Sequence, residues 1–390
     1  MTTAPLSPDD LSAALRLRDL SDPDQGPHAM QILLTDVLEN LRRAWGCPLD
    51  LQRRRPLVAI EDNYDRLGYA AEDITRDARY SRYVAETVML RSHTSAGIPP
   101  ALRRLAGGRD DGAGDVLLAL PGLCYRRDSI DRLHVGAPHQ LDLWRITTAR
   151  MTEADLTGMV RHVVEAVLPT ARWRTVPARH PYTRNGLQVD VETPAGWVEL
   201  AECGLAAPHV LAGAGLDPRR WSGLALGMGL DRAVMLRKGL ADIRLLRSTD
   251  PRIAGQLLDL SPWRPVSTYP PIRRDLSIVV TGRPDLELLG GTVRGVLGDT
   301  AEDLESLSIL SRTPYEDLPA AARTRLGLRP GQANVVLRLI LRPLSGTLTD
   351  QQANRLRDEV YAAVHEGPHW EWADASTAAR PGRQASASMS

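Results

Sequence analysis

A proline-rich break marks a linker between two parts of this chain. Four prolines fall within the eleven residues SPWRPVSTYPP at positions 261–271. Because proline lacks a backbone N–H and fixes its own backbone angle, such a cluster interrupts helices and sheets alike. The stretches before and after it are each long enough to build a core. We therefore expect a first domain over residues 27–264 and a second over residues 265–373.

The first domain carries the pattern of an α+β fold. Apolar residues repeat with a helical period from His28 to Trp45. Beyond them, short apolar strands alternate with turns: DVLLALPGLCYRR is followed by HQLDLWRI, and LQVDVET by GWVELAECG. Two such pairs predict an antiparallel sheet rather than a series of βαβ units.

The second domain shows a compact order of elements. RRDLSIVV, LESLSILSRTPY, ANVVLRLILRP and HWEWA have the character of strands, while LELLGGTVRGVLGD and TDQQANRLRDEVYAAVHEG have helical periods. The resulting order, βαββαβ, predicts a ferredoxin-like domain. At the ends of the chain, the polar residues 1–26 predict a flexible leader, and residues 374–390, which lack apolar mass, a disordered tail.

Composition and charge exclude several classes of function. The formal net charge is zero, which argues against non-specific binding of polyanions but leaves room for a local RNA contact. Cys47, Cys124 and Cys203 lie far apart without metal-ligand spacing, so we expect reduced thiols and no structural metal centre. No apolar run has the length of a signal peptide or a membrane span, which predicts a cytoplasmic protein without membrane contact.

Three segments carry residue types suited to binding a charged ligand. YRRDSIDRLHVGAPHQLD places Arg126 at the end of a strand, and Gln140 and Asp142 on one face of the next, where a guanidinium could hold a phosphate. LALGMGLDRAVMLRKG runs glycines into a helix that carries Arg232 in its first turn, and LRSHTSAG offers a histidine and a serine. Taken singly, these patterns are more typical of a surface hairpin, close packing and a capped turn.

Together, the three segments resemble the motifs of the class II phenylalanyl-tRNA synthetase family. LRSHTSA is similar to the family's LRxHTSx, YRRDSIDRLHVGAPHQLD to YRRDxxDxxHxxxFHQxE, and GLALGMGLDRAVMLRKGLADIR to GxAFGxGxERLAMLxxGIxDIR. WVELAECG resembles the family's strand WxEVxGCG. The second domain, beginning YPPIRRDLS, resembles the family's anticodon-binding domain, in the order of its single-chain enzymes. The likeness extends over about residues 28–372.

The resemblance implies a phenylalanine–tRNA ligase that uses ATP and Mg²⁺ to form phenylalanyl-adenylate and transfers the amino acid to tRNA(Phe), as a monomer or a homodimer. Its catalytic residues would be Arg126, on the α-phosphate, and Arg232, on the adenine and γ-phosphate. The implied ATP-binding residues are Arg126, Asp128, His134, Pro138, Gly227, Gly229 and Arg232, and the implied amino-acid-binding residues are His93, Ser95, Gln140, Asp142, His180, Tyr182 and Ala225, with His139 as a lesser candidate.

The chain departs from the family pattern around the amino acid. The family's Phe-Pro-Phe turn becomes His180-Pro181-Tyr182, which keeps one aromatic edge and adds polarity. Ala225 is retained at the position that, in the family, closes the pocket for the side chain of the amino acid. The resemblance therefore implies a preference for phenylalanine over tyrosine. Pro138 replaces a phenylalanine that stacks on adenine, and Asp142 replaces a glutamate, so that its carboxylate stands roughly 1 Å further from an ammonium.

Phenylalanine is absent from all 390 residues, although average usage would supply on the order of ten or more. A GC-rich genome would explain the single lysine, Lys238, among many arginines, but isoleucine and tyrosine are retained. A synthetase without the residue it supplies can be translated when charged tRNA is scarce, which suggests a backup or resistance enzyme. The alternatives are a codon-biased housekeeping enzyme, an adenylating paralogue for an aromatic phenylalanine analogue in biosynthesis, and an inactive RNA-binding or regulatory paralogue.

Overall fold

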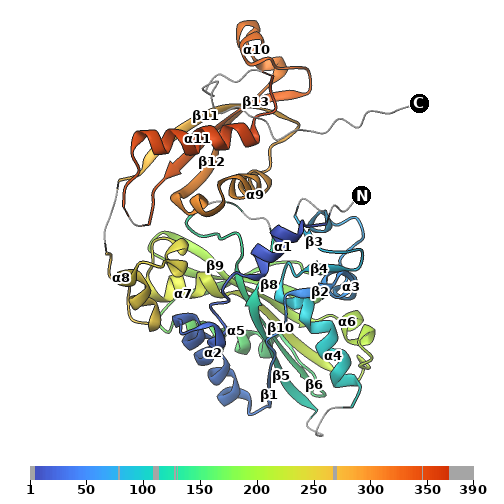
Figure 1. The fold of residues 1–390 in the computed structure, drawn as a ribbon. Coiled ribbons are helices and arrows are strands. Elements are labelled where there is room, and N and C mark those ends of the chain that lie inside the picture. Colours follow the sequence, from blue (N-terminus) through green and yellow to red (C-terminus); the bar gives the residue numbers. More distant parts are fainter. Residues whose placement is uncertain are drawn as a thin grey trace, which may run out of the picture. The chain divides into compact units, whose positions relative to one another are not determined.

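Two compact units make up the chain in the computed structural model (Figure 1). The structure describes residues 5–77, 80–108, 114–126, 129, 131–266, 270–344 and 346–368. The first unit comprises residues 1–128 and 132–268, and the second comprises residues 129–131 and 269–390. Both combine helices with mainly antiparallel sheets, which confirms the expected α+β class. None of the helices in the described ranges is long and apolar enough to cross a bilayer.

A seven-stranded sheet forms the centre of the first unit. In the order of the sheet, its strands are β1 (Leu49–Leu51), β5 (Asp115–Leu123), β6 (His139–Thr147), β10 (Ser222–Gly229), β9 (Gly196–Ala206), β8 (Thr183–Thr193) and β7 (Trp173–Pro177). All neighbours are antiparallel except β1, which runs parallel to β5. The pairs predicted from the sequence, β5 with β6 and β8 with β9, are both present.

One face of this sheet packs on helices α2 (Ala29–Trp45), α5 (Glu153–Val167) and α7 (Leu230–Lys238) (Figure 1). Alternate residues of each strand, such as Leu141 and Leu143 in β6, point into this core. Since successive side chains of a strand point to opposite faces, the residues between them lie on the other face of the sheet. That second face carries the candidate site described below.

Smaller elements complete the first unit. Helices α4 (Ile98–Ala106) and α6 (Pro208–Gly213) pack on the second face of the sheet, against apolar residues of β5, β6 and β10. A separate three-stranded sheet has the order β2 (Leu57–Ala59), β4 (Val88–Leu90), β3 (Arg82–Tyr83). The short elements are α3 (Ile60–Asn63), α8 (Pro251–Ala254) and the 3₁₀ helices η1 (Pro23–Gln25), η2 (Asp65–Leu67), η3 (Ile74–Arg76), η4 (Thr94–Gly97), η5 (Ile243–Arg247) and η6 (Gly255–Leu258).

Residues 5–26 are folded onto the first unit, whereas the sequence predicts a flexible leader there. They form helix α1 (Pro8–Leu15), capped by Ser7, and the turn η1. Leu20 is buried in the main core, and its backbone N–H donates to His139 Nε2 over 2.9 Å. The polar composition of the leader conceals this, because its few apolar residues are enough to fix a short segment: Leu20 in the main core, and Leu6, Leu11 and Ala14 in a smaller cluster around Leu123.

The single lysine of the chain is buried at the end of α7. Lys238 Nζ donates to the backbone carbonyls of Asp259 and Ser261 over 2.8 and 2.7 Å. In return, the backbone N–H of Trp263 donates to the Lys238 carbonyl over 2.7 Å. These bonds fasten the segment before the proline-rich break to the core of the first unit, so the ammonium has a structural role.

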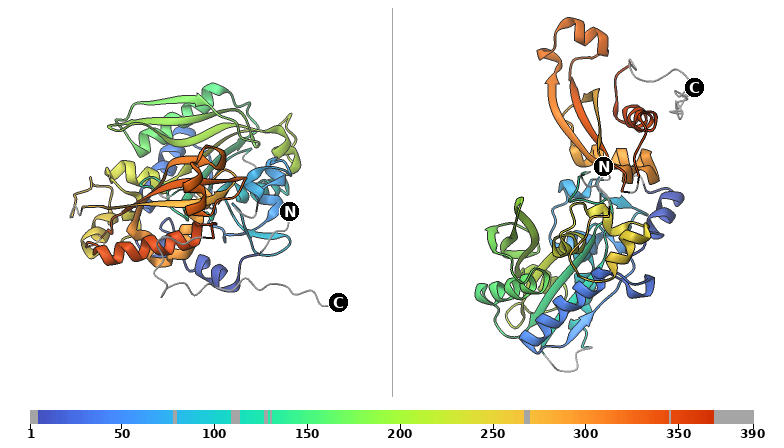
Figure 2. Two further views of the ribbon diagram at one scale, coloured as in Figure 1. Left: turned by 90° about the horizontal axis from the view of Figure 1, so that it is seen from above. Right: turned by 90° about the vertical axis from the view of Figure 1, so that its left-hand side faces the viewer.

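A three-stranded antiparallel sheet forms the second unit, in the order β11 (Ile272–Thr281), β13 (Gln332–Leu341), β12 (Leu304–Pro314). Every second residue of β13 from Ala333 onward is buried. Helices α9 (Leu286–Leu297) and α11 (Asp350–Val364) supply the other half of this core. Figure 2 shows α11 end-on beside the sheet.

The described part of the second unit has the order β11, α9, β12, α10 (Ala320–Leu326), β13, α11, with 3₁₀ helices η7 (Gly298–Asp303) and η8 (Tyr315–Asp317). This order contains the first five elements of the βαββαβ pattern, with the short helix α10 inserted between the two middle strands. The expected last strand, residues 369–373, and the expected tail, residues 374–390, lie outside the described residues.

Candidate active site

The antiparallel register gathers several predicted site residues on the second face of the large sheet. Asp142 in β6 lies directly opposite Gly227 in β10, and Gly227 lies directly opposite Glu202 in β9. Gln140 likewise lies opposite Gly229. Residues directly opposite each other in an antiparallel sheet project from the same face. The backbone alone therefore brings Asp142, Gln140 and Glu202 to one surface, with glycines between them.

A β-bulge in β9 adds a further carboxylate to this surface. The register between β8 and β9 shifts by one residue near the middle of the two strands. Leu200 and Ala201 consequently both face the core, so the residues on either side of them, Glu199 and Glu202, both project from the opposite face.

Asp142 is a buried carboxylate whose neighbours are neutral hydrogen-bond donors. Its exposed fraction is 2%. Thr94 Oγ1 donates to Asp142 Oδ2 over 2.6 Å, and Trp144 Nε1 donates to Oδ1 over 3.4 Å. In the described part of the chain, no basic side chain forms an ion pair with it. Burial raises the pKa of Asp142 above its ordinary value, so a cation bound here would stabilise its ionised form.

His93 presents two buried ring nitrogens that have no hydrogen-bond partner among the described residues. The ring stacks on Tyr69, with the centroids 5.6 Å apart. Burial, followed by the positive charge of Arg126, lowers the pKa of His93 to about 3, so the imidazole is neutral at physiological pH. Ser95 is also buried, and its hydroxyl bonds to Asp142. Buried polar atoms normally have partners, which makes the His93 ring a candidate contact for a polar ligand.

Aromatic rings surround the same region. Tyr182 lies 6.2 Å from Trp144, 6.4 Å from Tyr69 and 5.7 Å from His180, measured between ring centroids. Ala225 is buried and lies directly opposite Trp144 in the strand register. Such rings offer the edges and faces against which another aromatic ring packs.

His180 forms a hydrogen bond with Glu202. His180 Nε2 and Glu202 Oε2 are 2.9 Å apart. The hydrogen bond from His180 lowers the pKa of Glu202 more than burial raises it. The carboxylate therefore stays ionised beside the aromatic rings.

Arg232 is held at the other end of this surface, at the start of α7. Its Nη1 donates to the Glu199 carbonyl over 3.1 Å and lies 3.6 Å from Glu199 Oε1, while its Nη2 lies 3.2 Å from His134 Nε2. The positive charge of Arg126 acts on Glu199 as well as on Glu202 and His93. The glutamates of β9 therefore lie among three residues that the sequence predicted, Arg126, Arg232 and His134.

The other predicted ATP contacts have different outcomes. A Cβ added at Gly227 or Gly229 would meet no atom within 4 Å, so the sheet surface is open at both glycines. Pro138 lies just before β6, where its carbonyl accepts from Cys124 N over 2.8 Å. Asp128 lies outside the described residues.

The lesser candidate His139 is wrong as a substrate contact. Its ring is fully buried, with Nδ1 2.9 Å from Asp231 Oδ1 and Nε2 accepting from Leu20 N. As the neighbour of Gln140 in the same strand, it points to the opposite, helix-covered face. It joins the leader to the start of α7 instead.

Besides Glu199 and Glu202, three residues of the site have no counterpart in the predicted set. Trp144 could have been found from its spacing, since it lies two residues after Asp142 and so shares its strand face. Thr94 stands between the predicted His93 and Ser95, but nothing in the sequence indicates that its hydroxyl reaches Asp142. Tyr69 comes from a distant loop segment without a motif, and only the fold brings it to the site.

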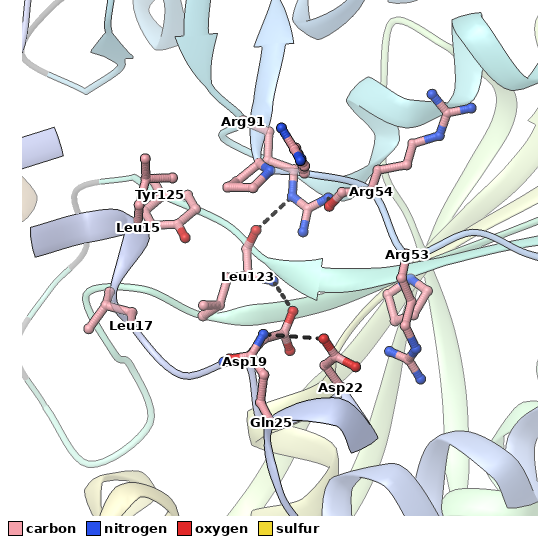
Figure 3. Close-up of a pocket in the computed structure, with 13 residues that line it drawn as sticks. Leu15, Leu17, Asp19, Asp22, Gln25, Arg53, Arg54, Arg91, Leu123 and Tyr125 are labelled. Carbon is pink, nitrogen blue, oxygen red and sulfur yellow. Dashed lines mark hydrogen bonds between the residues drawn. The ribbon is translucent and has the colours of Figure 1, made fainter. Parts of the chain in front are cut away.

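Figure 3 shows a separate hollow of about 270 Å³ where the leader crosses the end of β5. Arg91 Nε donates to the Leu123 carbonyl over 2.6 Å, and Asp19 Oδ2 accepts from Leu123 N over 3.3 Å. Gly122 has a φ of 146°, and a Cβ there would lie only 2.1 Å from the Arg91 guanidinium. None of the residues that line this hollow belongs to the predicted site. Its contacts secure the strand that leads to Arg126.

Comparison with known proteins identifies the family. The model of the tRNA synthetases class II core domain (F) matches residues 49–257, more than half of the chain. The chain belongs to this family. The matched region contains the large sheet, His93, Asp142 and both arginines of the candidate site. The described surface is therefore part of a class II tRNA synthetase core.

Individual relatives cover different parts of the chain. A phenylalanine–tRNA ligase alpha subunit of Prochlorococcus marinus (strain MIT 9313) is 34% identical over 194 residues, which are 50% of this chain and 56% of the relative. The chloroplastic/mitochondrial phenylalanine–tRNA ligase of Arabidopsis thaliana is 26% identical over 331 residues, covering 80% of this chain and 70% of the relative. A solved pyrrolysyl tRNA synthetase of Desulfitobacterium hafniense has a TM-score of 0.44 at 19% identity, over 57% of this chain and 74% of that one. The chain spans about half the length of several curated relatives that it matches.

Proposed function

We propose that this chain is a phenylalanine–tRNA ligase, which activates phenylalanine with ATP and transfers it to tRNA(Phe). The observation that carries the proposal is the buried carboxylate of Asp142, which has no basic partner in the described ranges and lies among Tyr69, Tyr182 and Trp144. An aromatic ring attached to an ammonium complements that combination. The names of the relatives, phenylalanine–tRNA ligases, point to the same amino acid.

The chemistry requires positioning and charge rather than a protein nucleophile. The carboxylate of the amino acid attacks the α-phosphorus of ATP, the bond to the β-phosphate oxygen breaks, and pyrophosphate leaves. Arg126 would stabilise the negative charge that develops on the α-phosphate, and Arg232 would hold the adenine and γ-phosphate. Neutral His93 would hydrogen-bond the carboxyl group of the amino acid, since both of its ring nitrogens lack a protein partner in the described part of the chain.

Mg²⁺ fits this site as a companion of ATP. The described residues contain no group of three or more His, Cys, Asp or Glu side chains that could hold a metal by themselves. Mg²⁺ usually binds through one or two carboxylates together with substrate phosphates, and Glu199, beside Arg232, is the carboxylate placed for this. Bound there, the ion would neutralise phosphate charge.

The proposal is tested by amino-acid-dependent ATP–pyrophosphate exchange across the twenty amino acids and several ring-substituted analogues. We expect phenylalanine to exceed tyrosine by at least about a hundredfold, because burying a hydroxyl near Ala225 without a partner costs roughly 1–3 kcal/mol or more. Equal or greater exchange with tyrosine, or none with any aromatic amino acid, would overturn the proposal. A second candidate, activation of an aromatic analogue, is favoured by the polar edge of His180, and the same panel would reveal it.

The second unit would bind the tRNA. We base this on its order of strands and helices and on its place after the synthetase core, both of which resemble an anticodon-binding domain. One chain would then carry both the amino-acid and the tRNA contacts, whether it acts as a monomer or a homodimer.

The absence of phenylalanine supports a backup or resistance role. Tyrosine, tryptophan and histidine occupy all the ring positions of the candidate site. Such a chain could be translated while phenylalanyl-tRNA is depleted. Arg126 and Arg232, both retained, argue against an inactive paralogue that only binds RNA.

A further inference from the structure

Two carboxylates stand on either side of one glycine in the centre of the candidate site. Asp142 and Glu202 each lie directly opposite Gly227, in the two strands that flank β10. Neighbouring strands are about 4.8 Å apart, so the backbones of these two residues are roughly 10 Å apart. Because a Cβ at Gly227 would meet no atom within 4 Å, nothing from β10 fills the space between them.

The two carboxylates act on the same neighbours. Burial is the main cause that raises the pKa values of Tyr69 and Tyr182, and the negative charges of both Asp142 and Glu202 add to it in each case. Glu202 thus reaches the aromatic end of the site, although it belongs to a different strand from Asp142. His93, whose two buried ring nitrogens have no hydrogen-bond partner among the described residues, stacks on Tyr69 in the same region.

Among the described residues, no arginine or lysine side chain bonds directly to either carboxylate, although the positive charge of Arg126 acts on Glu202. Asp142 accepts only neutral donors in the described ranges. Glu202 is bound through Oε2 by His180, and no described residue donates to its Oε1. Its side chain is 40% exposed, so a ligand can reach that oxygen. A cation held between the two carboxylates would satisfy both.

We propose that Glu202 binds the ammonium group of the amino-acid substrate together with Asp142, and that His180 orients Glu202 for this contact. The proposal rests on the amino-acid activation proposed above and adds a binding residue to it. In this arrangement His180 holds Oε2, which turns Oε1 toward the space above Gly227.

The arrangement explains three sequence departures as one unit. Where the family's motifs have glutamate, glycine and phenylalanine, this chain has Asp142, Glu202 and His180. Shortening the carboxylate in β6 weakens its reach to an ammonium, and the new carboxylate in β9 restores a second contact from the opposite side. The histidine then supplies the hydrogen bond that fixes the new carboxylate.

The test compares Glu202→Gln with the wild type in ATP–pyrophosphate exchange. We expect the KM for phenylalanine to rise roughly ten- to a hundredfold, as for loss of a charged hydrogen bond, while the KM for ATP stays within twofold. 3-Phenylpropionate, which lacks the ammonium, should inhibit the variant as strongly as the wild type. Equal inhibition would also show that the variant is folded. Glu192→Gln removes an exposed carboxylate of β8 that pairs with Arg172, and as the control it should change neither KM.

A rescue experiment separates binding from structural support. Glu202→Gly should weaken the binding of phenylalanine as much as Glu202→Gln does. Adding Asp142→Glu should restore most of the lost binding, because the longer carboxylate in β6 then reaches the ammonium by itself. A phenylalanine KM within twofold of wild type in Glu202→Gln, a change confined to ATP or Mg²⁺ dependence, or no rescue would overturn the inference. If the wild type itself activates no aromatic amino acid, the proposed function fails instead.

Discussion

Removing the charge of Asp142 should make the free protein more stable while it destroys amino-acid binding. Asp142→Asn keeps the size of the side chain, and the Thr94 hydroxyl can accept from the amide as readily as it donates to the carboxylate. An ion buried in protein loses several kcal/mol of hydration. Hydrogen bonds to a charge return about 1.5–3 kcal/mol each, but the raised pKa of Asp142 shows that burial outweighs them. We expect the substitution to remove the remaining cost, on the order of 1–2 kcal/mol.

The expected gain is measurable by thermal unfolding without ligands. For a unit of this size, 1 kcal/mol corresponds to about 2–4 °C, so the melting temperature should rise by about 2–8 °C at neutral pH. Binding should change in the opposite direction. Losing a buried contact between a carboxylate and an ammonium costs about 3 kcal/mol, which is more than a hundredfold in the affinity for phenylalanine.

The pH dependence of unfolding provides an independent check that Asp142→Asn raises stability. A carboxyl group whose pKa is raised in the folded state, as burial does to Asp142, stabilises the fold while it is protonated. That contribution is complete below its unfolded pKa and is lost as the pH rises through the folded value. The difference in melting temperature between Asp142→Asn and the wild type should therefore be small in acid and grow toward neutral pH.

Asp155→Asn is a control in which the stability of the folded protein should change in the opposite direction. Asp155 caps helix α5 by accepting hydrogen bonds from Thr152, which lower the pKa of its carboxyl. Its contribution to stability is present above the unfolded pKa and is lost as the pH falls through the folded value. Asp155→Asn should therefore destabilise at neutral pH and leave phenylalanine binding unchanged. A melting temperature that falls in Asp142→Asn, or phenylalanine affinity that survives in it, would refute the reasoning for Asp142.

Two further outcomes concern the whole chain. Truncation after Val266, which keeps the contacts of Ser261 and Trp263 with Lys238, should spare pyrophosphate exchange but abolish efficient charging of tRNA(Phe), and equal charging by the truncated protein would remove the role proposed for the second unit. During phenylalanine depletion, synthesis of this chain, followed by pulse labelling, should persist while phenylalanine-containing proteins of similar length stall; parallel arrest would contradict the backup role.

The sequence predicted those strands that have a recognisable apolar pattern. β5 is a nearly continuous apolar run, and β8 alternates apolar and polar residues from Leu187 onward, so the pairs β5–β6 and β8–β9 could be inferred from pattern and order. Strand β10 was not predicted, because glycine is depleted in strand interiors and this segment showed only glycines that run into a helix. In the structure Gly227 is flanked by β6 and β9, and Gly229 pairs with β6. A Cβ at either glycine would meet no atom within 4 Å, so both form open surface within a sheet.

The candidate site could be predicted only where a motif was contiguous. The resemblance supplied Arg126, His93 and Asp142, each within a short recognisable segment. The position of Glu202 depends on the pairing of β9 with β10, and the shared face of Glu199 and Glu202 depends on a bulge. Neither follows from local sequence, since register between strands is set by long-range packing.

A protein without phenylalanine must fill its aromatic positions with rings that carry polar atoms, and this shapes the site. A buried Tyr or Trp needs a partner for its O–H or N–H. Tyr64 donates to the Thr75 carbonyl over 2.8 Å, and the Trp144 indole donates to Asp142. The ring proposed to pack beside the substrate thus also bonds the carboxylate proposed to hold its ammonium. Replacing Trp144 by a hydrocarbon ring would loosen that carboxylate, so in this chain the aromatic wall and the charged contact act as one unit.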